Sequence, residues 1–177
     1  MYKTTSCRIY LEVYSTIMKI LIILLLFFNY NFVYANKDMY ILSSHYKTDS
    51  TVFNFSDNNN YSTWSMKGSW TDNFSNFGTV NCVGQAQKSA EDSLSIYGVC
   101  EIKDEKKLRK WWTIERNIGV TELGVGKSVQ LAAEGYWSVL NGTNCNYAIK
   151  HGEEYSYSIT KCKITSQQSN DLNKKVN

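Results

Sequence analysis

The sequence predicts an all-β protein, a small antiparallel up-and-down barrel of about eight strands that follows an N-terminal signal segment. Short segments of alternating apolar and polar residues recur, with turn-forming residues between them. Aromatic residues make up 14% of the chain and proline is absent, and Tyr, Trp and Phe favour strands. No stretch has convincing helical periodicity. Closure into a barrel would remove the exposed edges of so aromatic a sheet.

The N-terminal segment has the layout of a secretory signal peptide. Lys19 precedes an uncharged apolar run from Ile20 to Phe28, and Val33 and Ala35 have the small side chains of a cleavage site. A membrane span needs about 20 apolar residues, so the run is too short for an anchor. We therefore expect cleavage after residue 35, no stable membrane span afterwards, and export to the periplasm or the extracellular space.

Residues 1–17 lie ahead of a second plausible initiator, Met18. Either translation starts at Met18, or the signal peptide that starts at Met1 has a long N-terminal region. Residues 36–165 then form one domain of ordinary size, and residues 166–177, which are polar and have no apolar periodicity, form a flexible tail.

Charge excludes some partners. The formal net charge is +3, and Lys3, Arg8 and Lys19 fall within the signal segment. The rest of the chain is close to neutral, so we expect no binding to nucleic acid. Asp104 and Glu105 reduce the positive charge of the basic and aromatic stretch 103–112.

Four cysteines remain after the signal segment, and an even number in an exported chain indicates disulfides. Three connectivities are possible. We expect sequential pairing, Cys82 with Cys100 and Cys145 with Cys162, because each pair flanks a turn-like segment. No closely spaced cysteine pair of the zinc-binding kind occurs, so we expect no metal.

The first half of the domain contains an entry segment with a first strand, a polar loop over residues 71–76 and a turn over residues 89–93. Its expected strands lie within 36–46, 52–55, 61–70, 77–87 and 94–103.

The second half begins with an alternating strand over residues 108–116, followed by a glycine-punctuated segment over residues 119–128. Its further expected strands are 129–133, 135–140, 144–150 and 155–164. The last hairpin turn is formed by residues 151–154.

No catalytic signature emerges. Gly124 to Ser128 imitates the end of a phosphate-binding loop, but Thr121 stands where that motif needs a glycine. His45 or His151 could serve a Ser-His-acid triad, but the sequence has no Gly-x-Ser-x-Gly nucleophile elbow. We expect neither a catalytic residue nor a cofactor.

Arg116 is the candidate for ligand binding. Arg116 lies two residues after Ile114 and four after Trp112, so the three side chains should lie on the same face of their strand, which we expect to point inward. One reading is a structural ion pair or a cation–π contact with tryptophan, because a buried arginine needs a partner. The other is an anchor for an anionic ligand at the barrel mouth, with Trp70, Trp112 and Trp137 completing the binding surface.

Several motifs resemble those of small exported bacterial proteins of unassigned function. They are Gly68 to Cys82, Trp112 to Arg116, Gly124 to Lys127, Gly142 to Ala148 and Lys161 to Lys163. The resemblance covers residues 61–164 and implies a calycin or allene-oxide-cyclase-type β-barrel. It implies no activity, because no residues match the catalytic groups of the cyclase.

The leading hypothesis is therefore an exported non-catalytic barrel that binds a small apolar or amphipathic ligand in its interior or an envelope partner on its surface. The alternative is a secreted cyclase or isomerase that uses the barrel cavity. An eight-stranded barrel either fills with its own side chains or holds one small ligand. A filled interior would exclude ligand binding and catalysis alike. No feature of the sequence indicates an oligomeric state.

Overall fold

The computed structural model describes residues 18–19, 38–55, 59–89, 93–118 and 125–174. The signal segment predicted for residues 1–35 lies outside this part, apart from Met18 and Lys19, and stays a prediction. In the described part, no helix is long and apolar enough to cross a membrane.

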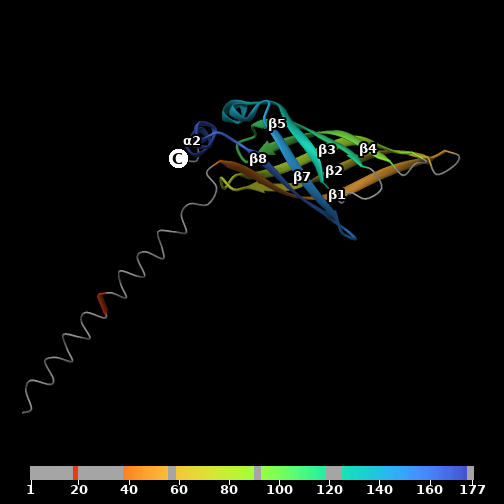
Figure 1. The fold of residues 1–177 in the computed structure, drawn as a ribbon, viewed down its shortest axis with the longest axis horizontal. Helices are drawn as coiled ribbons and strands as arrows, with labels where there is room; N and C mark the ends of the chain where they lie inside the picture. The colour runs from red at the N-terminus through yellow and green to blue at the C-terminus, as the bar shows by residue number, and fades with distance from the viewer. Residues whose placement is uncertain (1–17, 20–37, 56–58, 90–92, 119–124, 175–177) are drawn as a thin grey trace, which may run out of the picture. The chain divides into compact units, whose positions relative to one another are not determined.

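Eight antiparallel strands form a closed barrel in which each strand pairs with its sequence neighbours and β8 pairs with β1 (Figure 1). This confirms the predicted fold class. The strands are β1 (Met39–Asn54), β2 (Asn60–Asp72), β3 (Phe77–Lys88), β4 (Leu94–Asp104), β5 (Arg109–Ile118), β6 (Val125–Ala133), β7 (Asn144–His151) and β8 (Ser156–Lys163).

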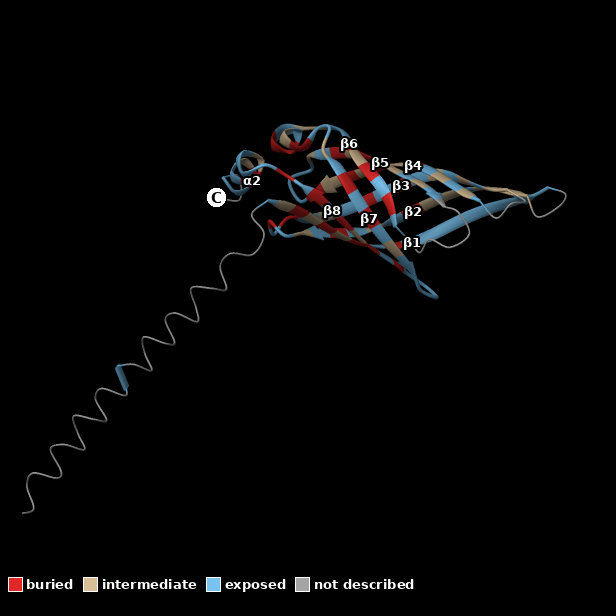
Figure 2. Cartoon of the chain, in the orientation of Figure 1, coloured by how far each residue is buried: buried red, intermediate tan, exposed pale blue. Residues whose placement is uncertain are grey.

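The barrel wall has unequal height. β1 pairs with β2 along its full length as far as Asn54 opposite Asn60, whereas its pairing with β8 ends at Tyr46 opposite Ser156. The predicted strands 36–46 and 52–55 are thus one strand, β1. Its outer half is exposed, while the buried residues gather in the part of the barrel nearer η1 and α2 (Figure 2).

Two disulfides staple neighbouring strands and confirm the sequential pairing. Cys82 on β3 lies opposite Cys100 on β4, and Cys145 on β7 lies opposite Cys162 on β8. Both bridges link directly opposed residues of a hairpin. Such bonds fit an oxidising compartment.

The prediction of a strand over residues 135–140 is wrong. This segment is a 3-10 helix, η1 (Gly135–Leu140). Gly135 has φ +57°, a backbone conformation that favours glycine. The consecutive residues Tyr136 and Trp137 are both buried, which the alternation of a strand would not permit.

The C-terminal segment also differs from the flexible tail expected for residues 166–177. Ser166–Asn173 form the helix α2, and Leu172 is fully buried. Thr165 caps it by accepting a hydrogen bond from the backbone N–H of Gln168, whose side chain accepts one from the backbone N–H of Thr165. This capping box satisfies two amide donors at the helix start. The Gln168 amide also donates to the carbonyl of Val139 in η1, which holds α2 against η1.

Candidate functional site

The interior of the barrel is divided into a packed end and a hollow end. The packed end lies next to η1 and consists of large side chains that are almost wholly buried. They are Tyr40, Trp70, Phe74, Trp112, Trp137 and Leu140. Tyr40 stacks against Trp112 with 6.2 Å between ring centroids, and Trp70 meets Trp137 edge to face at 5.8 Å.

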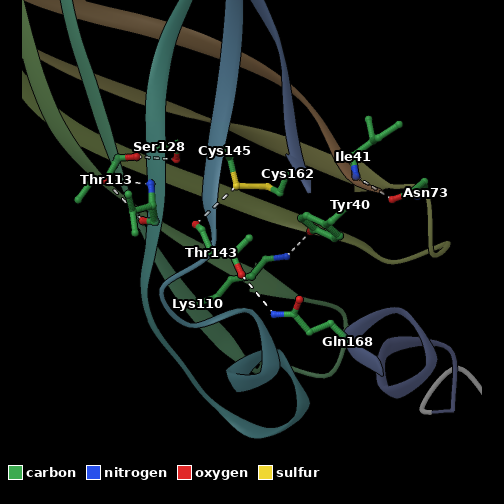
Figure 3. Close-up of a disulfide and its surroundings, with 11 residues drawn as sticks. Tyr40, Ile41, Asn73, Lys110, Thr113, Ser128, Thr143, Cys145, Cys162 and Gln168 are labelled. Carbon is green, nitrogen blue, oxygen red and sulfur yellow. Dashed lines mark hydrogen bonds between the residues drawn. A yellow bond between two sulfur atoms is a disulfide. The ribbon is translucent and has the colours of Figure 1, made fainter. Parts of the chain in front are cut away.

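A lysine lies inside this aromatic cluster. Lys110 is fully buried, and its Nζ donates to the Tyr40 hydroxyl at 2.6 Å, as Figure 3 shows. Nζ also lies 3.5 Å from the ring centroid of Trp137 and 4.1 Å from that of Trp70. Ring faces are attractive to a cation, so these contacts replace part of its hydration.

Burial lowers the pKa of Lys110 to about 7, although the nearby carboxylates of Asp72 and Asp104 act in the opposite direction. Burial also raises the pKa of Asp72, while Lys110 and hydrogen bonds from Asn76 and Phe74 lower it. The lysine and its acidic neighbours therefore form a buried polar layer at the closed end.

Asp104 joins η1 to the end of the sheet. Its carboxylate accepts from the Trp137 indole at 2.8 Å, from the Tyr136 hydroxyl at 3.0 Å and from the Leu108 amide at 2.8 Å. These contacts hold the 3-10 helix across the barrel end. The aromatic cluster and η1 together close that end.

The hollow end contains a cavity of about 210 Å³. Its lining is made of inward-facing residues from all eight strands. Trp112, Val80, Ile102 and Met66 are buried in this lining, whereas Ser50 and His151 are exposed. The cavity therefore runs from the aromatic cluster towards solvent, and Trp112 belongs to both regions.

Hydroxyl groups occupy one part of the cavity wall. Tyr46 is hydrogen-bonded to Ser158, and burial raises its pKa. Burial raises the pKa of Tyr147 to about 12, against the opposing effect of Arg116. Both phenols therefore keep their protons at neutral pH, and Arg116 lies close enough to Tyr147 to influence it electrostatically.

Glycines shape the cavity by making room for two rings. A Cβ on Gly84 or Gly98 would lie 2.2 Å or 2.4 Å from an atom of the Trp64 ring. A Cβ on Gly126 would lie 2.4 Å from the Tyr147 ring. Close approach of the rings to bare backbone needs glycine at these positions. Trp64 and Tyr147 thus lie along the inner wall of the barrel and line the cavity.

The four residues predicted to bind a ligand fall into two groups. Trp112 and Arg116 line the cavity. Trp70 and Trp137 lie in the packed cluster with Lys110 and are absent from the cavity lining. Binding by any of the four remains a prediction.

Sequence reasoning missed Lys110, Tyr46, Tyr147 and Trp64 as site residues. Lys110 shares the parity of Trp112 and Arg116 on β5, so strand alternation could have flagged a buried lysine. The two tyrosines carry no comparable signal, because the described strands contain both buried tyrosines, such as Tyr40, and exposed ones, such as Tyr97 and Tyr157. His151, which was expected at a turn, ends β7 and lies at the cavity, with Nδ1 2.8 Å from the Ser156 hydroxyl.

Among the described residues, no group of three or more His, Cys, Asp or Glu is placed to hold a metal ion. The hollow end of the interior is a small cavity lined by aromatic, hydroxyl, cationic and apolar side chains.

Two solved structures share the fold. A conserved protein of unknown function from Rhodopseudomonas palustris superimposes with a TM-score of 0.57 at 5% identity, over 70% of this chain and 93% of that one. An enzyme from Penicillium herquei superimposes with a TM-score of 0.54 at 9% identity, over 70% of this chain and 92% of that one. No family model and no curated protein sequence matches this chain. At these identities the similarity concerns the fold alone.

Proposed function

We propose that this protein is an exported, non-catalytic carrier or sensor that binds one compact amphipathic molecule inside its barrel. The observation that carries the proposal is the cavity of about 210 Å³, which an aromatic cluster closes at one end and which reaches exposed residues at the other. The cavity is smaller than typical ligand pockets of roughly 300–1,000 Å³, so its ligand is compact.

The chemistry of the lining supports an amphipathic ligand. The wall combines apolar side chains such as Ile114 and Met66 with hydroxyls such as Tyr46 and Tyr147. An apolar pocket with a few polar groups is the usual arrangement for orienting a small ligand. The resemblance to calycin or allene-oxide-cyclase barrels agrees with this proposal, because an eight-stranded barrel can hold one small ligand inside.

Two buried disulfides, together with the predicted signal segment, support a place of action outside the reducing cytosol. Binding of an envelope partner to the outside of the barrel is the other non-catalytic role proposed from the sequence.

The alternative of a cyclase or isomerase would use the same cavity. One neighbour in fold is an enzyme, and the phenols of Tyr46 and Tyr147 could donate to a developing oxyanion. However, the carboxylate whose pKa is raised, Asp72, is not among the residues that line the cavity. His151 is the only candidate for a general base in the described lining. We therefore place binding ahead of catalysis.

The proposal is tested by calorimetric titration of the full mature chain with one-ring probes, namely benzyl alcohol, benzoate and cyclohexanol. Ile114→Trp fills the cavity, and Glu115→Trp adds the same side chain to the outer face of β5 one residue later. We expect binding of one molecule per chain in the wild type and in Glu115→Trp, and its loss in Ile114→Trp.

Folding of both variants is checked by cooperative thermal unfolding and by intact disulfides. Failure of every probe to bind, or equal binding by folded Ile114→Trp, would contradict a binding cavity.

A further inference from the structure

None of the described residues that line the cavity has a negatively charged side chain. The lining contains neither aspartate nor glutamate, and neither asparagine nor glutamine. Its charged and polar side chains are arginine, histidine, tyrosine, tryptophan, serine, threonine and the cystine sulfurs. The lining therefore offers no negative charge, while its guanidinium and indole groups can only donate and its hydroxyls can donate or accept.

Trp112 provides a buried donor with no acceptor. Its side chain lines the cavity and is 3% exposed, and its indole Nε1 has no hydrogen-bond partner among the described residues. An indole N–H can only donate, and leaving it unsatisfied in a buried place is costly. An acceptor that enters the cavity and reaches Nε1 would remove this cost.

Arg116 supplies the positive charge. It lies on the same face of β5 as Trp112, four residues nearer the open end of the barrel. It already interacts within the protein, and a guanidinium has five N–H donors, so it can contact more than one group at once. The charge of Arg116 lowers the pKa of Tyr147, so it acts electrostatically on a residue of the cavity wall.

The two phenols add further donors near this charge. Tyr147 is protonated at neutral pH, as an ordinary tyrosine is, and burial raises its pKa further. Tyr46 is hydrogen-bonded to Ser158 and lies close enough to Tyr147 to affect the pKa of Tyr147. A phenol hydroxyl beside an arginine is a good donor to an anion.

We propose that the cavity selects a compact organic anion, specifically a small carboxylate whose charged group lies towards these donors and whose apolar body lies against the apolar side chains of the lining. This inference rests on the proposed binding function and specifies the class of its ligand. An anion in this place would exchange its hydration for the donors described above, which offset the cost of desolvating its charge. A cationic ligand would find no carboxylate in the described lining.

The experiment compares benzoate with benzyl alcohol, which has the same ring and no charge, by calorimetry at constant ionic strength. We expect benzoate to bind at least about tenfold more tightly, which corresponds to about 1.4 kcal/mol. Arg116→Met should abolish this preference, and Arg116→Lys should retain part of it because it keeps the charge. Lys127→Met removes one positive charge from the exposed face of β6 and should leave the preference unchanged.

The outcomes separate the two proposals. Equal affinities for benzoate and benzyl alcohol in the wild type would overturn anion selection and leave the binding function in place. Loss of the preference in Lys127→Met as well would show a general effect of net charge and would also overturn it. Binding of neither probe would overturn the binding function itself. The wild-type comparison needs no variant, so a failure of Arg116→Met to fold does not affect it.

Discussion

Gly126 on β6 lies directly opposite Tyr147 on β7, and the absence of a side chain at Gly126 makes room for the tyrosine ring. A Cβ at this position would meet Cε1, Cζ and the hydroxyl of Tyr147 at 2.4, 2.5 and 2.6 Å. The three nearest atoms all belong to one side chain. The pair therefore fixes the position of a cavity-lining phenol by local sterics.

Gly126→Ala should destabilise the protein, because the methyl group must displace the Tyr147 ring. Overpacking of this kind costs about 1–3 kcal/mol. The free energy of unfolding measured in urea should fall accordingly. The double variant Gly126→Ala with Tyr147→Leu should lose less than the sum of the single changes, because the clash is gone. Additive losses would show that the ring does not set the need for glycine.

The stability contributed by Lys110 should depend on pH. Its pKa is about 7 in the folded protein, below its usual 10.5, so the unfolded chain binds more protons between pH 7 and pH 9. The free energy of unfolding should then rise with pH in this window, by up to about 1.4 kcal/mol per pH unit from this group.

Lys110→Met should flatten that rise, whereas Lys127→Met, which changes an exposed lysine on β6, should keep it. Urea unfolding at pH 7, 8 and 9 at constant ionic strength measures the slopes. A rise in Lys110→Met as steep as in the wild type would contradict the assignment.

Each disulfide should stabilise the barrel substantially. Sequence separations of 18 and 17 residues correspond to about 3 kcal/mol per bridge in the chain-entropy model. The paired variants Cys82→Ala with Cys100→Ala and Cys145→Ala with Cys162→Ala should each lower the free energy of unfolding by about this amount. Peptide mapping without reductant should recover only the two hairpin bridges, and a peptide joining Cys82 to Cys145 would contradict the pairing.

Asp104 should be the most sensitive polar residue at the closed end of the barrel. Asp104→Ala removes the acceptor for Trp137, Tyr136 and the Leu108 amide at once, and hydrogen bonds to a charged group contribute about 1.5–3 kcal/mol each. We expect a loss of about 3 kcal/mol in chemical denaturation. The neighbouring Glu105 is exposed, so Glu105→Ala should change stability by less than about 0.5 kcal/mol. Similar losses in both variants would rule out the special role of Asp104.

The barrel itself could be predicted because strand alternation and turns are local properties of the sequence. β3, β4, β7 and β8 follow the pattern closely, and their directly opposed cysteines reinforce it. The 3-10 helix η1 could not be predicted this way, because Tyr136 and Trp137 are fixed by Asp104, a partner more than 30 residues away. Helix α2 does carry a local signal, the capping box from Thr165 to Gln168, but its single buried leucine gives no periodicity.

The candidate site was predictable in part. Arg116 and Trp112 follow from parity on one strand, and both line the cavity. Parity cannot tell how deep an inward residue lies along the barrel axis. Trp70 and Trp137 therefore could not be separated from cavity residues until the packed end around Lys110 was known. The empty space itself depends on volumes contributed by eight strands, and no local pattern encodes it.

Native mass spectrometry of the mature protein purified from its own cells tests the central claim most directly. Non-denaturing conditions keep a bound molecule in the barrel. We predict one small acidic molecule retained per chain, released on denaturation and absent from Ile114→Trp. A wild-type protein that carries no small molecule and binds neither benzoate nor benzyl alcohol would contradict the account.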